Sequence, residues 1–287
     1  MITVQNLHYC YPNQKSDTIK DISFTIEKGE IYGFLGPSGA GKSTTQKILI
    51  RLLSGFGGNV SVLGKDLKSW STDFYNHIGV GFELPNHYAK LTGLENLQLF
   101  ASFYDKPSRN LMELFAMVGL QAAANQKTEA YSKGMKMRLN FIRALIHNPD
   151  ILFFDEPTSG LDPVNARIIK DIILDLKRQG KTIFLTTHNM HDADELCDRV
   201  AFITDGQIQA EGAPKNLKMK YGKPLLRVEY QNQGLISSDF DLEHLGQNNE
   251  FLKLIRTHPI VSMHSKEATL DEVFIKTTGV KLNAIDL

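Results

Sequence analysis

A glycine-rich segment at residues 36–43 has the residue types that bind a polyphosphate. It reads Gly-Pro-Ser-Gly-Ala-Gly-Lys-Ser and fits the pattern Gly-x-x-x-x-Gly-Lys-Ser/Thr. Small residues let the backbone wrap closely round phosphates, so that successive N–H groups point inward, and a following helix adds the partial positive charge of its N-terminus. Lys42 would reach the β- and γ-phosphates, and Ser43 would ligate Mg²⁺. The predicted nucleotide site consists of Gly36, Pro37, Ser38, Gly39, Ala40, Gly41, Lys42, Ser43 and Thr44.

Two adjacent acids, Asp155 and Glu156, follow the apolar run Ile-Leu-Phe-Phe at residues 151–154. A phosphate-binding loop needs a carboxylate to complete the Mg²⁺ shell, and that carboxylate usually ends a neighbouring strand. Asp155 has this position. Glu156 comes next and could polarise a water molecule for attack on the γ-phosphate. The alternative for either acid alone is an N-cap at a strand-to-helix turn.

Buried strands and helices must alternate for these groups to meet at one edge of a sheet. Residues 31–35 form an apolar run, as expected of a strand buried on both faces, and lead through the glycine-rich segment into a helix that Gly55 ends. The runs 151–154 and 182–186 flank a helix at 164–178. Strands that alternate with helices of this length predict a parallel α/β sheet with right-handed crossovers, that is, a P-loop NTPase sheet.

Two further regions accompany this sheet. The first 30 residues alternate between apolar and polar residues, which predicts an N-terminal antiparallel β-subdomain. Residues 84–147 contain apolar residues at helical spacing and predict a helical subdomain inserted into the core. We expect residues 1–216 to form one nucleotide-binding domain.

The last part of the chain, residues 217–287, differs in character from the core. Leu226, Val228 and Tyr230 alternate with charged residues, as in a half-exposed strand, whereas residues 231–249 are polar with little pattern. Thr-Leu-Asp-Glu at residues 269–272 is a capping box that predicts a short helix. This part is expected to be a small α+β appendage.

The composition is that of an ordinary globular protein without a strong charge. The 287 residues are 42% hydrophobic and 22% charged, and 32 Lys and Arg balance 32 Asp and Glu. Because there is no basic excess, no nucleic-acid partner is expected. Two cysteines are too few for a disulfide framework, so we expect a cytoplasmic location. No apolar run approaches the roughly 18 residues that span a bilayer, so any membrane part must come from another chain.

Three further segments resemble those of the ATP-binding-cassette (ABC) ATPases. Tyr-Ser-Lys-Gly-Met at residues 131–135 resembles the signature of that family, whose consensus is Leu-Ser-Gly-Gly-Gln. Residues 157–162 are similar to its D-loop, and Thr-Thr-His at 186–188 ends at the position of its switch histidine. Order and spacing agree over about residues 1–215. The resemblance implies an ATP hydrolase that uses ATP and Mg²⁺.

The resemblance also implies roles for individual residues. Ser132 and Gly134 would bind the nucleotide held by the P-loop of an opposite subunit, in a head-to-tail dimer that buries two ATP molecules. His188 would contact the γ-phosphate and hold the geometry of the attacking water. Asp162 would link the two sites across the dimer.

Some positions leave alternatives open or depart from the family pattern. The aromatic residue that stacks on adenine is Tyr11 by position, with Tyr9 as the alternative. Glu83 stands where the family has a glutamine; a carboxylate still ligates Mg²⁺ but, unlike glutamine, cannot donate a hydrogen bond to the water. In the signature, Lys133 replaces a glycine and Met135 replaces the glutamine. Lys133 either adds charge near phosphate or faces solvent.

One branch of the family is particularly similar, the ATPase subunits of bacterial ABC-2-type exporters. The shared features are the variant signature, Leu-Thr-Gly-Leu-Glu-Asn at residues 91–96 and Leu-Asp-Glu-Val-Phe at residues 270–274. In that branch a separate polytopic permease forms the membrane part, so this chain would be peripheral on the cytoplasmic face of the cell membrane. A groove at about residues 83–105 would receive a short helix of the permease, and ordinary packing inside the insertion is the alternative.

The second ATPase subunit implied by the family can be another copy of this chain. A homodimer would be self-sufficient because all parts of the composite site are present, and pairing with a different ATPase is the alternative. The rival function is a non-transport ABC ATPase that acts in regulation or assembly, or on ribosomes or nucleic acid.

Overall fold

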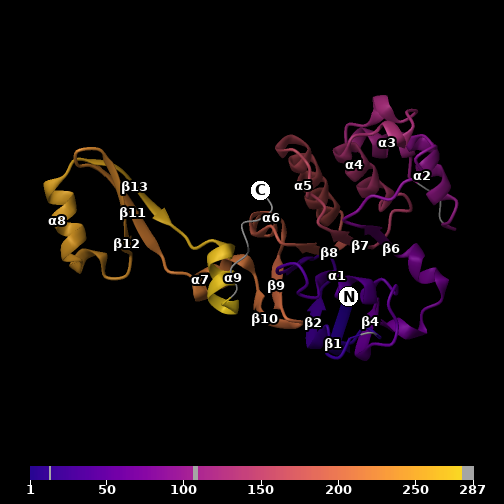
Figure 1. Ribbon diagram of the computed structural model, residues 1–287, viewed down its shortest axis with the longest axis horizontal. Coiled ribbons are helices and arrows are strands. Elements are labelled where there is room, and N and C mark those ends of the chain that lie inside the picture. Colours follow the sequence, from indigo (N-terminus) through magenta and orange to yellow (C-terminus); the bar gives the residue numbers. More distant parts are fainter. Residues whose placement is uncertain (13, 106–108, 280–287) are drawn as a thin grey trace. The chain divides into compact units, whose positions relative to one another are not determined.

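The computed structural model describes residues 1–12, 14–105 and 109–279 of the chain (Figure 1). These residues form two compact units, the first ending at Glu211 and the second starting at Gly212. Helix α7 (Pro214–Tyr221) lies wholly in the second unit, where it packs on α9 (Leu270–Thr278). The division expected from the sequence, after residue 216, falls within α7. No helix within the described ranges is both long enough and apolar enough to cross a membrane.

A six-stranded sheet forms the centre of the first unit. Its strands, in spatial order, are β10 (Gln207–Gly212), β9 (Arg199–Thr204), β3 (Ile31–Leu35), β8 (Thr182–Thr187), β7 (Ile151–Asp155) and β6 (Ile78–Gly81). The neighbours from β9 across to β6 pair in parallel, which confirms the predicted α/β sheet. Every residue of β3 and β8 is buried, in agreement with the apolar run of β3 and the apolar centre of β8.

Helices that follow these strands bring the chemical groups to one edge of the sheet. α1 (Lys42–Leu49) follows β3, α5 (Pro163–Arg178) follows β7, and α6 (Met190–Leu196) follows β8. Because parallel strands end at the same edge, the segments after β3, β7 and β8 meet there. Short 3₁₀ helices lie in other connections, at Leu67–Ser69, Thr72–Asn76, Gln121–Ala123, Thr128–Ala130 and Leu245–Gln247.

An antiparallel sheet packs against the central one. Its strands, in spatial order, are β2 (Ile19–Ile26), β1 (Ile2–Tyr9), β4 (Gly57–Val62) and β5 (Lys65–Asp66). In β2, Ile22, Phe24 and Ile26 are buried and the residues between them are exposed, as the alternation predicted. The ring of Phe24 stacks on Tyr32 of β3 at a centroid distance of 5.4 Å and on Phe184 of β8 at 6.4 Å. One aromatic core therefore joins the two sheets.

The predicted helical insertion lies between β6 and β7. It consists of α2 (Gly93–Ala101), α3 (Leu111–Met117) and α4 (Lys133–Arg143), which lie together in Figure 1. Thr92 and Glu95 form a capping box at the start of α2. The buried Asn96 fixes the preceding loop, because its side chain accepts from the N–H of Tyr88 at 2.9 Å and donates to the carbonyl oxygen of the same residue at 3.1 Å.

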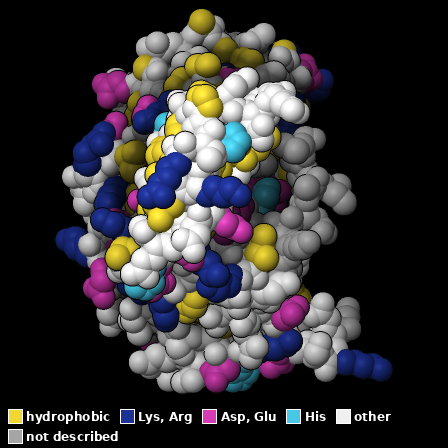
Figure 2. Space-filling model, turned by 90° about the vertical axis from the view of Figure 1, so that its left-hand side faces the viewer, with side chains coloured by type: hydrophobic (Ala, Val, Ile, Leu, Met, Phe, Trp, Pro, Cys, Tyr) yellow, Lys and Arg dark blue, Asp and Glu magenta, His cyan; other side chains and the backbone are white. Residues whose placement is uncertain are grey.

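The second unit is the small α+β appendage. Its sheet has the order β12 (Leu235–Asp241), β11 (Leu225–Gln231) and β13 (Ile260–Lys266), and α8 (Asn249–Thr257) packs on it through Phe251, which contacts Val228 and Phe240. β12 falls inside the polar stretch 231–249, for which the sequence showed little pattern. On the face of this unit seen in Figure 2, exposed hydrophobic side chains lie among lysines and arginines.

Candidate functional site

The loop between β3 and α1 requires glycine at defined positions. Gly39 and Gly41 have φ angles of +82° and +110°, in the left-handed region that L side chains rarely adopt. A methyl group built on Gly36 would lie 2.1 Å from the carbonyl oxygen of Ile203 in β9. The loop therefore packs too closely on β9, and turns too sharply before α1, for larger residues at these positions.

Lys42 is the first residue of α1 and is only 8% exposed. Its Nζ donates to the carbonyl oxygens of Gly36 and Pro37 at 2.6 and 3.0 Å. Burial lowers the pKa of Lys42, and nearby carboxylates, of which Glu156 has the largest effect, oppose this shift. The loop thus holds an ammonium group next to converging acids, which suits a phosphate accompanied by a metal ion.

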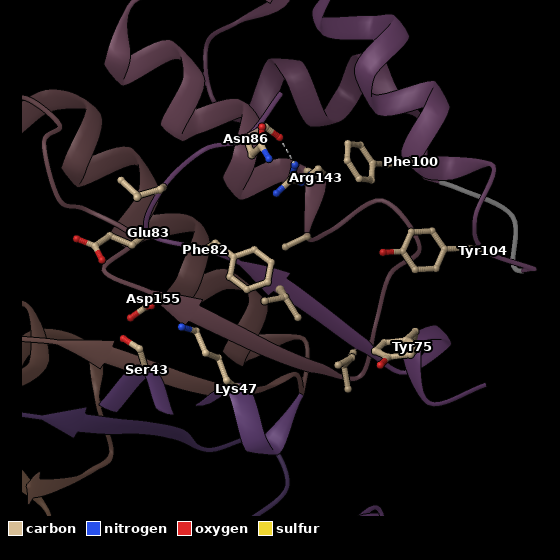
Figure 3. A pocket seen from close by; sticks show the side chains of 14 residues that line it. Ser43, Lys47, Tyr75, Phe82, Glu83, Asn86, Phe100, Tyr104, Arg143 and Asp155 are labelled. Carbon is tan, nitrogen blue, oxygen red and sulfur yellow. Dashed lines mark hydrogen bonds between the residues drawn. The ribbon is translucent and has the colours of Figure 1, made fainter. Parts of the chain in front are cut away.

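Ser43, Asp155 and Glu83 line one cavity of about 680 Å³ (Figure 3). Oγ1 of Thr186 in β8 donates a hydrogen bond to Oδ1 of Asp155, which orients this carboxylate at the end of β7. Hydroxyl and carboxylate oxygens are the ligands that Mg²⁺ prefers, and the phosphates of a nucleotide together with water complete such a site. The donor set therefore fits Mg²⁺.

Glu156 is buried, and its backbone has a φ of +49°, which is uncommon for a residue other than glycine. Its Oε1 accepts from the backbone N–H of His188 at 2.8 Å and lies 2.7 Å from Nδ1 of the same residue. Its Oε2 accepts from Oγ1 of Thr187 at 2.9 Å. Both oxygens are thus engaged by the end of β8, so the orientation of the carboxylate is fixed before substrate arrives, as a general base requires.

Ser132, Gly134 and Asp162 lie apart from this cavity, since none of them lines it. Ser132 is the N-cap of α4, and its Oγ accepts from the N–H of Met135 at 3.2 Å. Asp162 is the N-cap of α5, and hydrogen bonds from Asn165 lower its pKa. Ser132 and Asp162 are exposed, so both are accessible to a second subunit.

The two candidate adenine-stacking residues differ in burial. Tyr9 is 6% exposed and belongs to the hydrophobic core. Tyr11 is half-buried, meets Tyr9 edge to face at 5.0 Å, and has its hydroxyl 3.2 Å from Oγ1 of Thr44 in α1. This geometry favours Tyr11, because its ring lies beside the helix that follows the phosphate-binding loop.

The structure adds three residues that sequence reasoning did not assign. Thr186 and Thr187 hold the two acids, and their signal in the sequence was a pair of hydroxyl residues at the end of an apolar run. Arg143 of α4 lines the far end of the cavity, donates to the carbonyl oxygen of Asn86 at 2.8 Å and lies over the ring of Phe100 at 4.6 Å (Figure 3). Its place depends on tertiary packing, which no local pattern indicates.

The family model described as ABC transporter matches residues 19–159, and the one described as Fluoroquinolone efflux ABC transporter C-terminal domain matches residues 225–267. A fluoroquinolones export ATP-binding protein of Mycobacterium tuberculosis is 52% identical over 98% of this chain and 94% of its own length. The bacitracin transport ATP-binding protein BcrA of Bacillus licheniformis is 32% identical over 97% of both chains. A dimeric structure of an ATP-binding cassette bound to ADP and Pi, in a post-hydrolysis state, has a TM-score of 0.69 and 28% identity over 74% of this chain and 98% of that chain.

A sheet with a phosphate-binding loop, an acid pair and a histidine at one edge, together with these relatives, defines an ATP-hydrolysing cassette. The chain belongs to the family of ABC transporter ATP-binding proteins. It binds ATP and hydrolyses it. The resemblance drawn from the signature, the D-loop and the switch histidine is thereby confirmed at the level of the family.

Proposed function

We propose that this chain is the ATP-hydrolysing subunit of an exporter, and that two copies close head to tail on two ATP molecules to drive a separate membrane permease. The observation that carries the proposal is the cavity in Figure 3. Its nucleotide end contains the oxygens of Ser43, Glu83 and Asp155, and its other end is lined by aromatic side chains of the helical insertion. Because both ends belong to one cavity, the nucleotide and a partner would contact adjoining walls.

In the proposed reaction Lys42 exchanges its bonds to loop carbonyls for bonds to the β- and γ-phosphates. Glu156 accepts a proton from the attacking water, and His188 holds that water and the γ-phosphate in line. Mg²⁺, bound by Ser43 and Asp155 with Glu83 nearby, would neutralise charge that develops on the phosphates. Every group named here lies at the end of β7 or in the segments that directly follow β3, β6, β7 and β8.

The opposite subunit completes each site in this proposal. The exposed N-terminus of α4, with Ser132 and Gly134, binds the γ-phosphate of the ATP held by the second copy, and Asp162 connects the two sites. Tyr11 stacks on the adenine. The similarity to a dimeric cassette bound to ADP and Pi supports this arrangement.

The permease is proposed to insert a short amphipathic helix into the groove at the far end of the cavity. The rings of Phe100 and Tyr104 form an apolar wall there beside Arg143, and Leu84, which follows Glu83 in the chain and also lines the cavity, is 77% exposed. His87 does not belong to this surface, because it is partly buried and its Nε2 lies 2.9 Å from the carbonyl oxygen of Lys136. The chain would thus be peripheral on the cytoplasmic face of the membrane.

Fluoroquinolones are the proposed cargo class. The support is the relative from Mycobacterium tuberculosis, which is similar over nearly the whole chain, and the match of residues 225–267 to a C-terminal domain of fluoroquinolone efflux transporters. Export and transport are also in the names of more distant relatives that match almost end to end. This favours transport over a regulatory or ribosomal role.

Affinity purification from membranes of the native host tests the partner. We expect the tagged chain to recover a polytopic membrane protein, and recovery of ribosomes or DNA in its place would contradict the proposal. Cells that express both proteins should then accumulate less of a fluorescent fluoroquinolone than cells with the permease and the Glu156→Gln variant. If both kinds of cell accumulate the drug equally although the parent hydrolyses ATP, fluoroquinolones are not the cargo, and the assignment as a transporter subunit still stands.

A further inference from the structure

Gln46 is a buried amide on α1, on the turn of the helix that follows Lys42. Its side chain belongs to a residue that is only 2% exposed, and within the residues that the structure describes its Nε2 has no hydrogen-bond partner. Its Oε1 lies 3.3 Å from Oγ1 of Thr186 in β8. A buried N–H group without a partner is costly, and an apolar side chain of similar length would avoid that cost. Packing alone therefore does not explain an amide at this position.

The hydroxyl of Thr186 has several oxygen neighbours but a single proton to donate. The neighbours are Oδ1 of Asp155, Oε1 of Gln46 at 3.3 Å and the carbonyl oxygen of Phe154 at 3.4 Å. Asp155 offers the charged acceptor, and a hydrogen bond to a charged group is about twice as strong as one between neutral groups. When the proton goes to Asp155, the oxygens of Gln46 and Thr186 face each other with no proton between them.

We propose that Gln46 is a positioning residue for the magnesium ligand Asp155 and that it acts through Thr186. A half-turn of the amide brings Nε2 to Oγ1 of Thr186, to which it donates, and Thr186 in turn donates to Asp155. Such a chain strengthens each of its hydrogen bonds, because every donor polarises the next. It commits the proton of Thr186 to Oδ1 of Asp155 and leaves the other carboxylate oxygen for Mg²⁺. The inference rests on the proposed Mg²⁺ site and adds a relay from α1 through β8 to β7.

A double-mutant cycle on Mg²⁺ affinity tests this relay. The readout is the Mg²⁺ concentration that half-maximally strengthens binding of a nonhydrolysable fluorescent ATP analogue, so it does not depend on turnover. Gln46→Met removes the amide and should raise this concentration about fivefold, the effect of one neutral hydrogen bond. In a Thr186→Val background, where the relay is already broken, Gln46→Met should add less than about twofold. Gln98→Met is the control, because it makes the same change on the exposed surface of α2.

Stability distinguishes the relay from ordinary packing. Because methionine buries no polar group, the urea midpoint of Gln46→Met should equal or exceed that of the parent, and a lower midpoint would count against the inference. An unchanged Mg²⁺ response in Gln46→Met, or an equal loss with and without Thr186→Val, would overturn it and leave the proposed Mg²⁺ site standing. If binding of the analogue by the parent does not respond to Mg²⁺ at all, the proposed site fails and the inference fails with it.

Discussion

Replacement of Glu156 by glutamine removes the proposed general base with little change in shape. Glutamine keeps Oε1, which can still accept from the N–H of His188, and the hydroxyl of Thr187 can accept from the new amide group instead of donating. We therefore expect the free energy of unfolding to change by only about 1 kcal/mol. Loss of the proton acceptor should lower turnover by about 10²- to 10⁴-fold, which corresponds to about 3–5 kcal/mol of transition-state stabilisation.

Phosphate release at saturating ATP measures this loss, and a fluorescent ATP analogue shows whether nucleotide binding survives. Glu113→Gln is a matched control, because it makes the same chemical change on the exposed surface of α3. Turnover of Glu156→Gln within about threefold of the parent would refute the assignment of the base. A variant that is slow and also unable to bind ATP would instead indicate that Glu156 maintains the loop around Lys42.

Lys42→Ala should weaken ATP binding by about 10- to 100-fold, and an unchanged affinity in a nucleotide titration would count against the phosphate-binding loop. Burial lowers the pKa of His87 to about 4, below the value of 6.5 in the unfolded chain. The folded protein therefore favours the neutral ring, and the contribution of His87 to the free energy of unfolding is complete above pH 6.5 and is lost as the pH falls toward 4. Between pH 7 and pH 5 we expect the free energy of unfolding in urea to fall by about 1–2 kcal/mol more in the parent than in His87→Gln, and parallel pH profiles would disprove this. Phe184→Ala removes a fully buried ring from the aromatic core and should cost about 3–5 kcal/mol by chemical denaturation, with a loss below about 1 kcal/mol inconsistent with that packing.

The parts of the fold that the sequence predicted well are those in which one local requirement, such as burial on both faces or a left-handed backbone angle, determines the residue types. β3, β7 and β8 are buried on both faces along most of their length, so most of their residues are apolar, and this is visible without a structure. The loop before α1 needs glycine for its left-handed angles, and Thr269 and Glu272 form the capping box that their spacing predicted. In each case local chemistry and the fold agree.

The features that the sequence analysis missed leave only a weak local pattern or depend on tertiary contacts. β12 is an edge strand in which only Phe240 is buried, so it has no alternation to detect. α8 did carry a signal, with Asn248 as its N-cap and Phe251, Leu254 and Ile255 at helical spacing. Burial and the contact with Thr44 distinguish Tyr11 from Tyr9, and both depend on segments that are distant in the chain.

The hydrogen bonds between Glu156 and the end of β8 affect how fast a single copy can hydrolyse ATP. The attacking water must compete for the oxygens of Glu156 with the hydroxyl of Thr187 and with the backbone N–H and imidazole of His188. In the proposed dimer, contact of His188 with the γ-phosphate would free Oε1 of Glu156 for that water, so a single copy should hydrolyse ATP more slowly than the closed dimer. Copies that are not paired in a closed dimer would then hydrolyse little ATP.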